Sequence, residues 1–141
     1  MIEIQIHGID EIIQTLNRIA QKTENKQDLM ADIAETMRLA VDKNFEEEGR
    51  PAWLGLKYPN KSGNILQGES GDLRSGITAE SNNNQAIVGS NKVYAAIHQF
   101  GGMAGRGRKV KIPARPFLQL TEQDEADILD DVQDYWQKLI G

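Results

Sequence analysis

Apolar side chains recur at helical spacing between residues 27 and 47, a stretch that would be about 30 Å long as an α-helix. The apolar stripe contains Leu29, Met30, Ile33, Met37, Val41 and Phe45. Gly49 and Pro51 follow it, and both residue types commonly end helices. The periodicity therefore predicts a long amphipathic helix with one buried face.

One strand and two further helices are predicted on either side of this stretch. Residues 2 to 7 alternate isoleucine with polar residues, which indicates a half-buried strand. Apolar residues recur at helical spacing from 9 to 21 and again from 128 to 140. Thr121 is predicted to cap the last helix, with Asp124 three residues later as its acidic partner.

The middle of the chain is predicted to hold a long irregular segment, a hairpin and a short helix. Residues 49 to 72 are rich in Gly, Pro, Asn and Ser, and such a loop in a compact domain is usually functional or mobile. Two β-prone runs separated by three asparagines predict an antiparallel hairpin around residues 73 to 90. The stretch from 93 to 102 could be a strand or a short helix, and its two alanines and the two glycines at its end favour the helix.

The length and composition of the chain are typical of one folded domain. It has 141 residues, of which 39% are apolar and 26% charged, and it shows no internal repeat. Residues 1–141 are therefore expected to form a single domain, with mobile loops at about 49–72 and 101–111. No apolar run approaches the ~20 residues needed to span a bilayer, and no signal peptide is apparent. We expect no membrane partner.

The segment from 101 to 117 differs from the rest of the chain in its charge. It has five basic residues and no acidic one, whereas the whole chain has a net charge of −5. Residues 121 to 141 hold seven acids and one base. The five basic residues are Arg106, Arg108, Lys109, Lys111 and Arg115. A basic, glycine-rich loop of this kind could cradle phosphates, bind nucleic acid or contact an acidic protein surface.

Residues that commonly perform catalysis are absent or wrongly spaced. The chain has no cysteine, no G-x-S-x-G nucleophile motif and only two histidines, His7 and His98, which lack metal-ligand spacing. His98 lies beside Ile97 and Phe100, and we interpret it as a hydrogen-bonded packing residue. A Ser–His–acid site that uses His98 stays open as an alternative. The sequence predicts no enzymatic activity, no metal and no cofactor.

The basic segment lacks the glycine pattern of a nucleotide-binding loop. Gly105 and Gly107 form a G-x-G, but Val110 stands where a third glycine is required, and no Lys-Ser pair follows. Nucleic acid stays open as a ligand, because five cations could neutralise several phosphates. Against it, no aromatic residue for base stacking lies between 101 and 116, and the acidic last helix would repel a phosphate backbone.

Four stretches of the sequence carry a family resemblance. They are FEEEGRPAWLGL (45–56), ILQGESGDLRSGI (65–77), VGSNKVYAAIHQFGG (88–102) and IPARPFLQL (112–120). Together they resemble the blocks of the phage virion morphogenesis family, the tail-completion proteins of phages and prophages. The likeness extends over nearly the whole chain, and its most specific part is YAAIHQFGG followed by IPARPFL.

The resemblance implies a structural role in virion assembly, with no catalysis and no cofactor. It also implies an α+β fold, in which two or three helices pack on a small, mostly antiparallel sheet, similar to tail-terminator and neck proteins. The order read from the residues, namely strand, two helices, hairpin and terminal helix, agrees with that fold.

On this interpretation the protein completes the tail or the head–tail junction of a phage or prophage. Its partners would be other tail or neck proteins and further copies of itself in a ring, first in the host cytoplasm and then in the virion. A basic loop on a chain with acidic helices suits contact between subunits. The predicted partner-binding residues are Arg106, Arg108, Lys109, Lys111 and Arg115. The alternative is a neck protein that contacts nucleic acid through residues 101–115.

Overall fold

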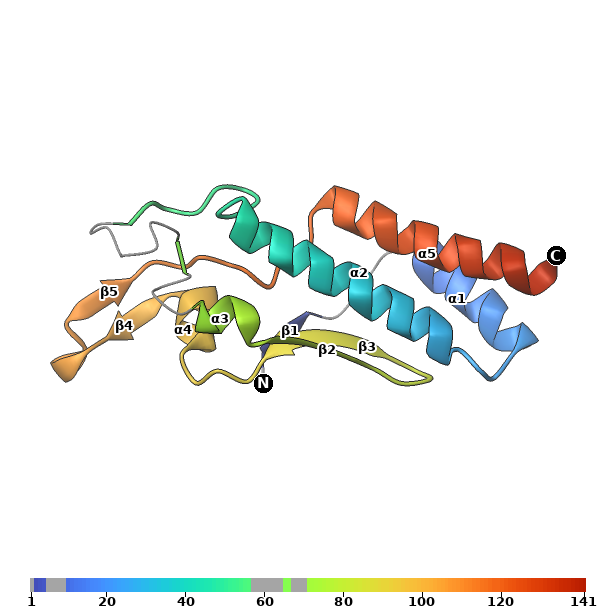
Figure 1. The fold of residues 1–141 in the computed structure, drawn as a ribbon, viewed down its shortest axis with the longest axis horizontal. Helices are drawn as coiled ribbons and strands as arrows, with labels where there is room; N and C mark the ends of the chain where they lie inside the picture. The colour runs from blue at the N-terminus through green and yellow to red at the C-terminus, as the bar shows by residue number, and fades with distance from the viewer. Residues whose placement is uncertain (1, 5–9, 57–64, 67–70) are drawn as a thin grey trace.

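The computed structural model describes residues 2–4, 10–56, 65–66 and 71–141, and it is an α+β protein with two small antiparallel sheets (Figure 1). The elements in chain order are β1 (Ile2–Ile4), α1 (Asp10–Lys22), α2 (Gln27–Glu46), α3 (Asp72–Ser75), β2 (Ile77–Ser81), β3 (Ala86–Ser90), α4 (Ala95–Phe100), β4 (Gly102–Ala104), a 3-10 turn (Arg106–Arg108), β5 (Val110–Ile112) and α5 (Glu122–Ile140). The predicted fold class is confirmed, and the likeness to tail-terminator and neck proteins stays a prediction.

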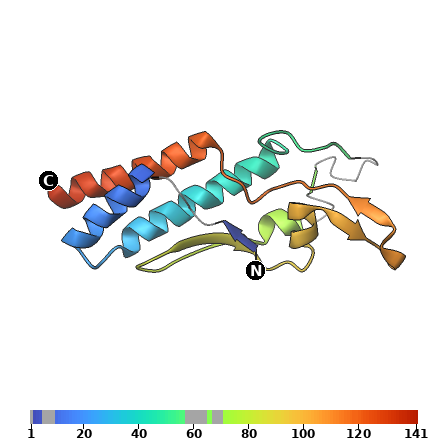
Figure 2. The ribbon, with the colours of Figure 1, turned by 180° about the vertical axis from the view of Figure 1, so that it is seen from behind.

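Helix α2 is the centre of the fold. It packs on strands β2 and β3 on one side and on helix α5 on another (Figure 1). Helix α1 packs on α5 and lies in front of it in the view from behind (Figure 2). The apolar stripe predicted for α2 is therefore covered by both the sheet and a helix, and Leu29, Met37, Val41 and Phe45 are fully buried.

The larger sheet has the strand order β1-β3-β2, and both pairings are antiparallel. Ser90 at the end of β3 lies opposite Ile2 on one side and Ile77 on the other. The turn between β2 and β3 is closed by Asn82, whose Oδ1 accepts hydrogen bonds from the N–H groups of Asn84 (2.8 Å) and Gln85 (3.0 Å). The predicted hairpin is thus present, and its asparagines form the turn.

Buried apolar residues from both layers form one core. Phe45 at the end of α2 lies against two other aromatic rings, with centroid distances of 5.8 Å to Trp53 and 5.5 Å to Phe117. Ile128 and Val132 of α5 are fully buried in the same cluster. The core therefore extends from the helices to the segment after α2, through Trp53, and to the end of the basic segment, through Phe117.

The predicted start of the last helix is confirmed in detail. The Thr121 hydroxyl accepts a hydrogen bond from the Asp124 N–H (3.1 Å), and Asp124 Oδ2 accepts one from the Thr121 N–H (2.8 Å). This reciprocal pair is a capping box, which satisfies two backbone donors at the start of α5.

One predicted boundary needs correction, and two other predicted segments lie partly outside the described residues. The hairpin expected from residue 73 begins at Ile77, because residues 72–75 form the short helix α3. The strand expected over residues 2 to 7 is seen at Ile2–Ile4, and residues 5–9 lie outside the described part of the chain. Much of the predicted mobile loop at 49–72 also lies outside it, and its mobility stays a prediction.

Candidate functional site

The basic segment forms a hairpin at one end of the elongated molecule, and α5 ends at the other end (Figure 1). Strands β4 and β5 pair antiparallel, with Met103 opposite Lys111. In the connecting turn the Arg108 N–H donates to the Gly105 carbonyl at 3.0 Å. Gly107 in this turn has a φ of +74°, where a side chain would introduce strain. The loop predicted from the glycines is therefore corrected to two short strands, and we call residues 102–112 the basic hairpin.

Four of the five predicted partner-binding residues lie on the basic hairpin. The side chains of Arg106, Arg108, Lys109 and Lys111 are all exposed. None of them forms a hydrogen bond or an ion pair with another residue that the structure describes. Because no described acid is paired with these four cations, the hairpin presents a positive potential to solvent or to a partner.

Exposed apolar side chains gather at the same end of the molecule. Nine large apolar side chains are exposed among the described residues, and six of them lie on the hairpin, on or just before α4, or in the segment 53–56 beside the hairpin's base. These six are Leu54, Val93, Tyr94, Phe100, Met103 and Val110. Apolar groups rimmed by charge are typical of a protein-interaction surface.

Arg115 has surroundings quite unlike those of the four hairpin cations. It is 8% exposed, and its guanidinium donates to the carbonyls of Leu54 (2.8 Å) and Gly55 (3.0 Å). Its backbone N–H donates to the His98 carbonyl at 2.8 Å. Arg115 therefore ties the base of the hairpin to α4 and to the segment after α2, and it does not share the hairpin's exposed surface.

Gln99 also holds the base of the hairpin in place. Its Oε1 accepts hydrogen bonds from the N–H groups of Phe117 (3.1 Å) and Leu118 (2.9 Å), and its Nε2 donates to the Leu118 carbonyl (3.1 Å). Gly101 follows α4 with a φ of +73°, and a Cβ there would lie 2.8 Å from the Ala114 backbone nitrogen. The exposed hairpin thus grows from a base in which α4 and residues 112–118 are closely joined.

A second polar network joins the end of α2 to the start of α5. The Arg50 guanidinium donates to both carboxylate oxygens of Asp124 (3.1 and 2.8 Å), to Asn44 Oδ1 (2.7 Å) and to the Ala40 carbonyl (2.6 Å). Asn44 Nδ2 donates in turn to the carbonyls of Phe117 (2.7 Å) and Gln119 (2.9 Å). The network therefore fixes the segment that leads from the hairpin into α5.

The charge of Asp124 is stabilised by this network. Burial alone would raise the pKa of its carboxyl, but hydrogen bonds from Arg50 and Thr121 outweigh that effect and place the pKa below its ordinary value. The sequence identified Asp124 only as a helix cap. It gave no signal for Arg50, whose partner lies 74 residues further along the chain.

The hydrogen bonding of the His98 imidazole differs from what the sequence predicted. Its Nδ1 is buried and has no hydrogen-bond partner among the described residues, so the expectation of a hydrogen-bonded histidine is wrong for this atom. Burial, and then the nearby positive charge of Arg115, lower the pKa of His98. Its ring lies edge-on to Tyr94, with centroids 6.1 Å apart. No described acid or serine is hydrogen-bonded to this histidine, and His7 lies outside the described residues.

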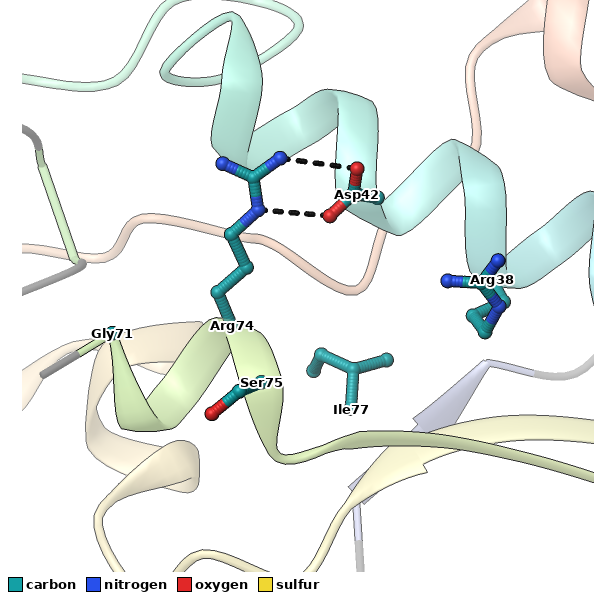
Figure 3. Close-up of a pocket in the computed structure, with 6 residues that line it drawn as sticks. All are labelled: Arg38, Asp42, Gly71, Arg74, Ser75 and Ile77. Carbon is teal, nitrogen blue, oxygen red and sulfur yellow. Dashed lines mark hydrogen bonds and ion pairs between the residues drawn. The ribbon is translucent and has the colours of Figure 1, made fainter.

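A pocket of about 330 Å³ lies between α2 and α3 (Figure 3). Arg74 reaches across it and donates to both oxygens of Asp42, at 2.8 and 3.0 Å. These hydrogen bonds lower the pKa of the Asp42 carboxyl. The other arginine of the pocket, Arg38, pairs with Glu35 on the same helix, with a distance of 2.9 Å from Nε to Oε2. Since both arginines have acidic partners, the pocket is poorly suited to bind an anion. The Arg74–Asp42 pair instead joins α3 to α2.

Neither a metal centre nor a membrane span is found in the part of the chain that the structure describes. No group of three or more acidic, histidine or cysteine side chains there is arranged to hold a metal ion. No described helix is both long and apolar enough to cross a bilayer.

Comparison with known proteins identifies the family of this chain. The sequence profile of the phage virion morphogenesis family matches residues 8–137. The chain belongs to this family. The match includes α1 to α4, the basic hairpin and its base, and most of α5, so the resemblance carried by the four sequence stretches is confirmed.

Two relatives extend the comparison. The chain is 59% identical over 140 residues to the Mu-like prophage FluMu G protein 2 of Haemophilus influenzae, and the match covers 99% of each chain. It is 41% identical over 115 residues to the putative capsid assembly protein G of Escherichia phage Mu, with 72% of this chain and 73% of that protein covered. No solved structure gives a significant match. A structural role in phage particle assembly follows from the family and its members.

Proposed function

We propose that this protein completes the phage tail or the head–tail junction, and that it does so through contacts made by the basic hairpin. Subunits would associate into a ring and bind other tail or neck proteins, first in the host cytoplasm and then in the virion. The observation that carries the proposal is that four cations without a partner among the described residues lie with exposed apolar side chains at one end of the molecule.

The charges and the apolar groups have different parts in such a contact. Burying apolar side chains such as Phe100 (71% exposed) and Val93 (97% exposed) supplies the main favourable free energy of association. Exposed ion pairs contribute only about 0–1 kcal/mol each. The hairpin cations would therefore steer the approach of an acidic partner and fix the register of the contact.

The base of the hairpin suits this use. Gln99 and Arg115 hold it to α4 and to the segment after α2 with five side-chain hydrogen bonds. A contact surface on a fixed base loses less conformational entropy on binding than one on a free loop. The name of the phage Mu relative refers to capsid assembly, and a site at the head–tail junction would be compatible with that name.

The alternative is a neck protein whose basic hairpin contacts nucleic acid. The four exposed cations favour it, because each could neutralise a phosphate. Binding to DNA would weaken steeply as salt is raised, and an assembly contact with an apolar centre would weaken less. Titration of fluorescent duplex DNA at two salt concentrations separates the two.

The proposal is tested in a phage whose own copy of the gene is deleted and replaced by variants. The test variant carries Arg106→Ser, Arg108→Ser, Lys109→Ser and Lys111→Ser. The control carries four exposed cations changed to Ser elsewhere, at Arg18, Lys22, Lys92 and Lys138, so that the net charge is the same. Particles with finished tails are then counted by electron microscopy.

We expect the hairpin variant to lose finished particles, while the control keeps them and both variants unfold at nearly the wild-type temperature. Tails of uncontrolled length would indicate tail completion, and finished tails beside separate full heads would indicate the junction. Normal numbers of finished particles with the hairpin variant would remove the hairpin from the assembly contact.

A further inference from the structure

A groove of about 320 Å³ runs between α2 and α5. Thr36, Leu39, Lys43 and Glu46 line it from α2, at spacings of three and four residues that place them on one helix face. Asp127 lines it from α5. Leu39 is 49% exposed there, although most large apolar side chains of α2 are buried. The groove therefore offers an apolar contact point at an interface between two helices.

The groove lies at the end of a row of carboxylates. Glu46 and Asp127 line the groove itself, and the row continues along the two helices with Asp32, Asp131 and Asp134. None of these five forms an ion pair with another described residue. Burial, together with the charges of Asp32, Asp134 and Asp127, raises the pKa of Asp131. Asp42 and Asp124 also line the groove, but they are paired with Arg74 and Arg50, and Arg74 interacts electrostatically with Glu46 as well. Lys43 is the basic residue that lines the groove itself.

The basic hairpin and this groove have complementary features. The hairpin carries four cations that have no partner among the described residues, and it has an exposed apolar side chain on each face: Met103 (51% exposed) on the face of Lys111, and Val110 (54% exposed) on the other. The groove carries unpaired carboxylates around the exposed Leu39. Each surface supplies the charge that the other lacks, and each has an apolar contact to bury.

We propose that the basic hairpin of one copy seats in the α2–α5 groove of a second copy. This inference rests on the proposed function, and it names the acceptor surface that the hairpin binds. The hairpin lies at one end of the molecule, while the groove lies between the C-terminal half of α2 and the first turns of α5, near the middle of the molecule (Figure 1). Donor and acceptor are therefore different surfaces, and the contact is head to tail. Such contacts repeat from subunit to subunit, and they close into a ring when the rotation between neighbours allows it.

Cross-linking tests the contact directly, because the natural chain has no cysteine. One copy carries Met103→Cys on the hairpin, and a second, affinity-tagged copy carries Leu39→Cys in the groove. The control copy carries Ile13→Cys, since Ile13 is a similarly exposed apolar residue (43%) on α1. The two copies are mixed at high concentration and treated with a short bis-maleimide. We expect several times more mixed dimer with Leu39→Cys than with Ile13→Cys, and equal yields would overturn the inference.

Charge exchange tests whether complementarity drives the contact. Lys109→Glu with Lys111→Glu should weaken self-association in low salt, and so should Glu46→Lys with Asp127→Lys. A mixture of these two variants should associate again, because the reversed charges are complementary. The control, Glu11→Lys with Glu80→Lys, makes the same change in net charge at two exposed sites outside the groove. Light scattering across a concentration series gives the molar mass, and a mixture that stays as weakly associated as its components would count against the contact.

Failure of this inference can be told apart from failure of the proposed function. If the hairpin variant loses finished particles but Glu46→Lys with Asp127→Lys assembles normally, the hairpin binds another virion protein, and the proposed acceptor is wrong. If the hairpin variant assembles normally, the assembly role of the hairpin itself fails. The head-to-tail contact is supported if Lys109→Glu with Lys111→Glu and Glu46→Lys with Asp127→Lys each lose finished particles when expressed alone, and particles are recovered when the two variant chains are expressed together.

Discussion

Two pairs of arginines in this protein have opposite surroundings. Arg50 and Arg115 are largely buried, and every contact that holds them is internal: a carboxylate, an amide oxygen and backbone carbonyls. Arg106 and Arg108 are exposed and have no side-chain partner among the described residues. The same side chain therefore has two uses here, because burial decides whether its donors are satisfied by the fold or left for another molecule.

This difference divides the molecule into a body and a contact end. In the body, polar side chains join segments far apart in the sequence, and removing one would leave buried groups unpaired. At the contact end, the charges cost little free energy to remove, because water already solvates them. Stability should therefore respond strongly to changes in the first group and weakly to changes in the second.

The largest effect is expected from Arg50→Met. The substitution removes the partner of Asp124, whose side chain is 4% exposed, and breaking a buried ion pair in this way costs about 3–5 kcal/mol of unfolding free energy. Denaturant unfolding followed by circular dichroism measures it. The matched change Arg106→Met on the hairpin should cost less than about 0.5 kcal/mol. Equal costs would break the division between the two groups.

A smaller loss is expected from Gln99→Leu. This change leaves the Phe117 and Leu118 N–H groups without their acceptor, and an unsatisfied buried donor costs about 1–3 kcal/mol. Thermal unfolding gives the size of the loss, with Gln123→Leu as the control, since Gln123 is exposed and bonds only to Asp127. A Gln99→Leu protein as stable as the control would show that the base of the hairpin does not need this side chain.

Asp131→Asn should raise stability slightly at neutral pH. The pKa of Asp131 is raised by burial and by neighbouring carboxylates, so the folded state binds its proton more tightly than the unfolded state does. The resulting penalty is absent below the ordinary Asp pKa, grows as pH rises through the raised value, and is complete at neutral pH. Asparagine keeps an oxygen acceptor for Thr36 and removes the charge. The gain should be below about 1 kcal/mol, because the group is partly solvated.

Unfolding measurements at a series of pH values test whether Asp131→Asn raises or lowers stability. Unfolding free energies of the wild type and Asp131→Asn should converge as pH is lowered toward 4. A variant that is less stable than the wild type at pH 7 would mean that Asp131 has a favourable partner in the folded protein.

Local opening of the basic hairpin should require the smallest free energy. Within the described part of the chain, the three-residue strands β4 and β5 pair only with each other, and their residues are mostly exposed. We expect rapid hydrogen exchange at residues 101–111 in the free protein and slow exchange at Phe117 and Leu118, since local opening follows burial and contact density. Strong protection across 101–111 would show that the contact end is as firmly held as the body.

The sequence predicted those parts of the fold that depend on near neighbours. The α2 stripe and its end before Gly49 follow from local periodicity and from helix-ending residues. The Thr121–Asp124 cap was also predicted, because its two residues are three positions apart. The strands of the basic hairpin were missed, because its glycines favour a loop and their contribution to the turn depends on the pairing of β4 with β5.

The candidate site was predicted in part, for the same reason. Sequence proximity placed Arg115 with the four hairpin cations, and nothing local separates it from them. Its role depends on the carbonyls of Leu54 and Gly55, which lie about 60 residues away in the chain. The α2–α5 groove was not predicted either, because it exists only once α2 and α5 pack together.

Asp124 gives the body of the molecule a particular kind of cooperativity. As the capping residue it holds the first turn of α5, and as the partner of Arg50 it holds the end of α2. Helix ends normally fray one by one, but here loosening of either end removes a partner from the other. The end of α2 and the start of α5 should therefore open together, and this joint opening should require a large free energy. The basic hairpin should fluctuate more than the helix ends do. It can therefore adapt its shape to a partner while the rest of the fold stays intact.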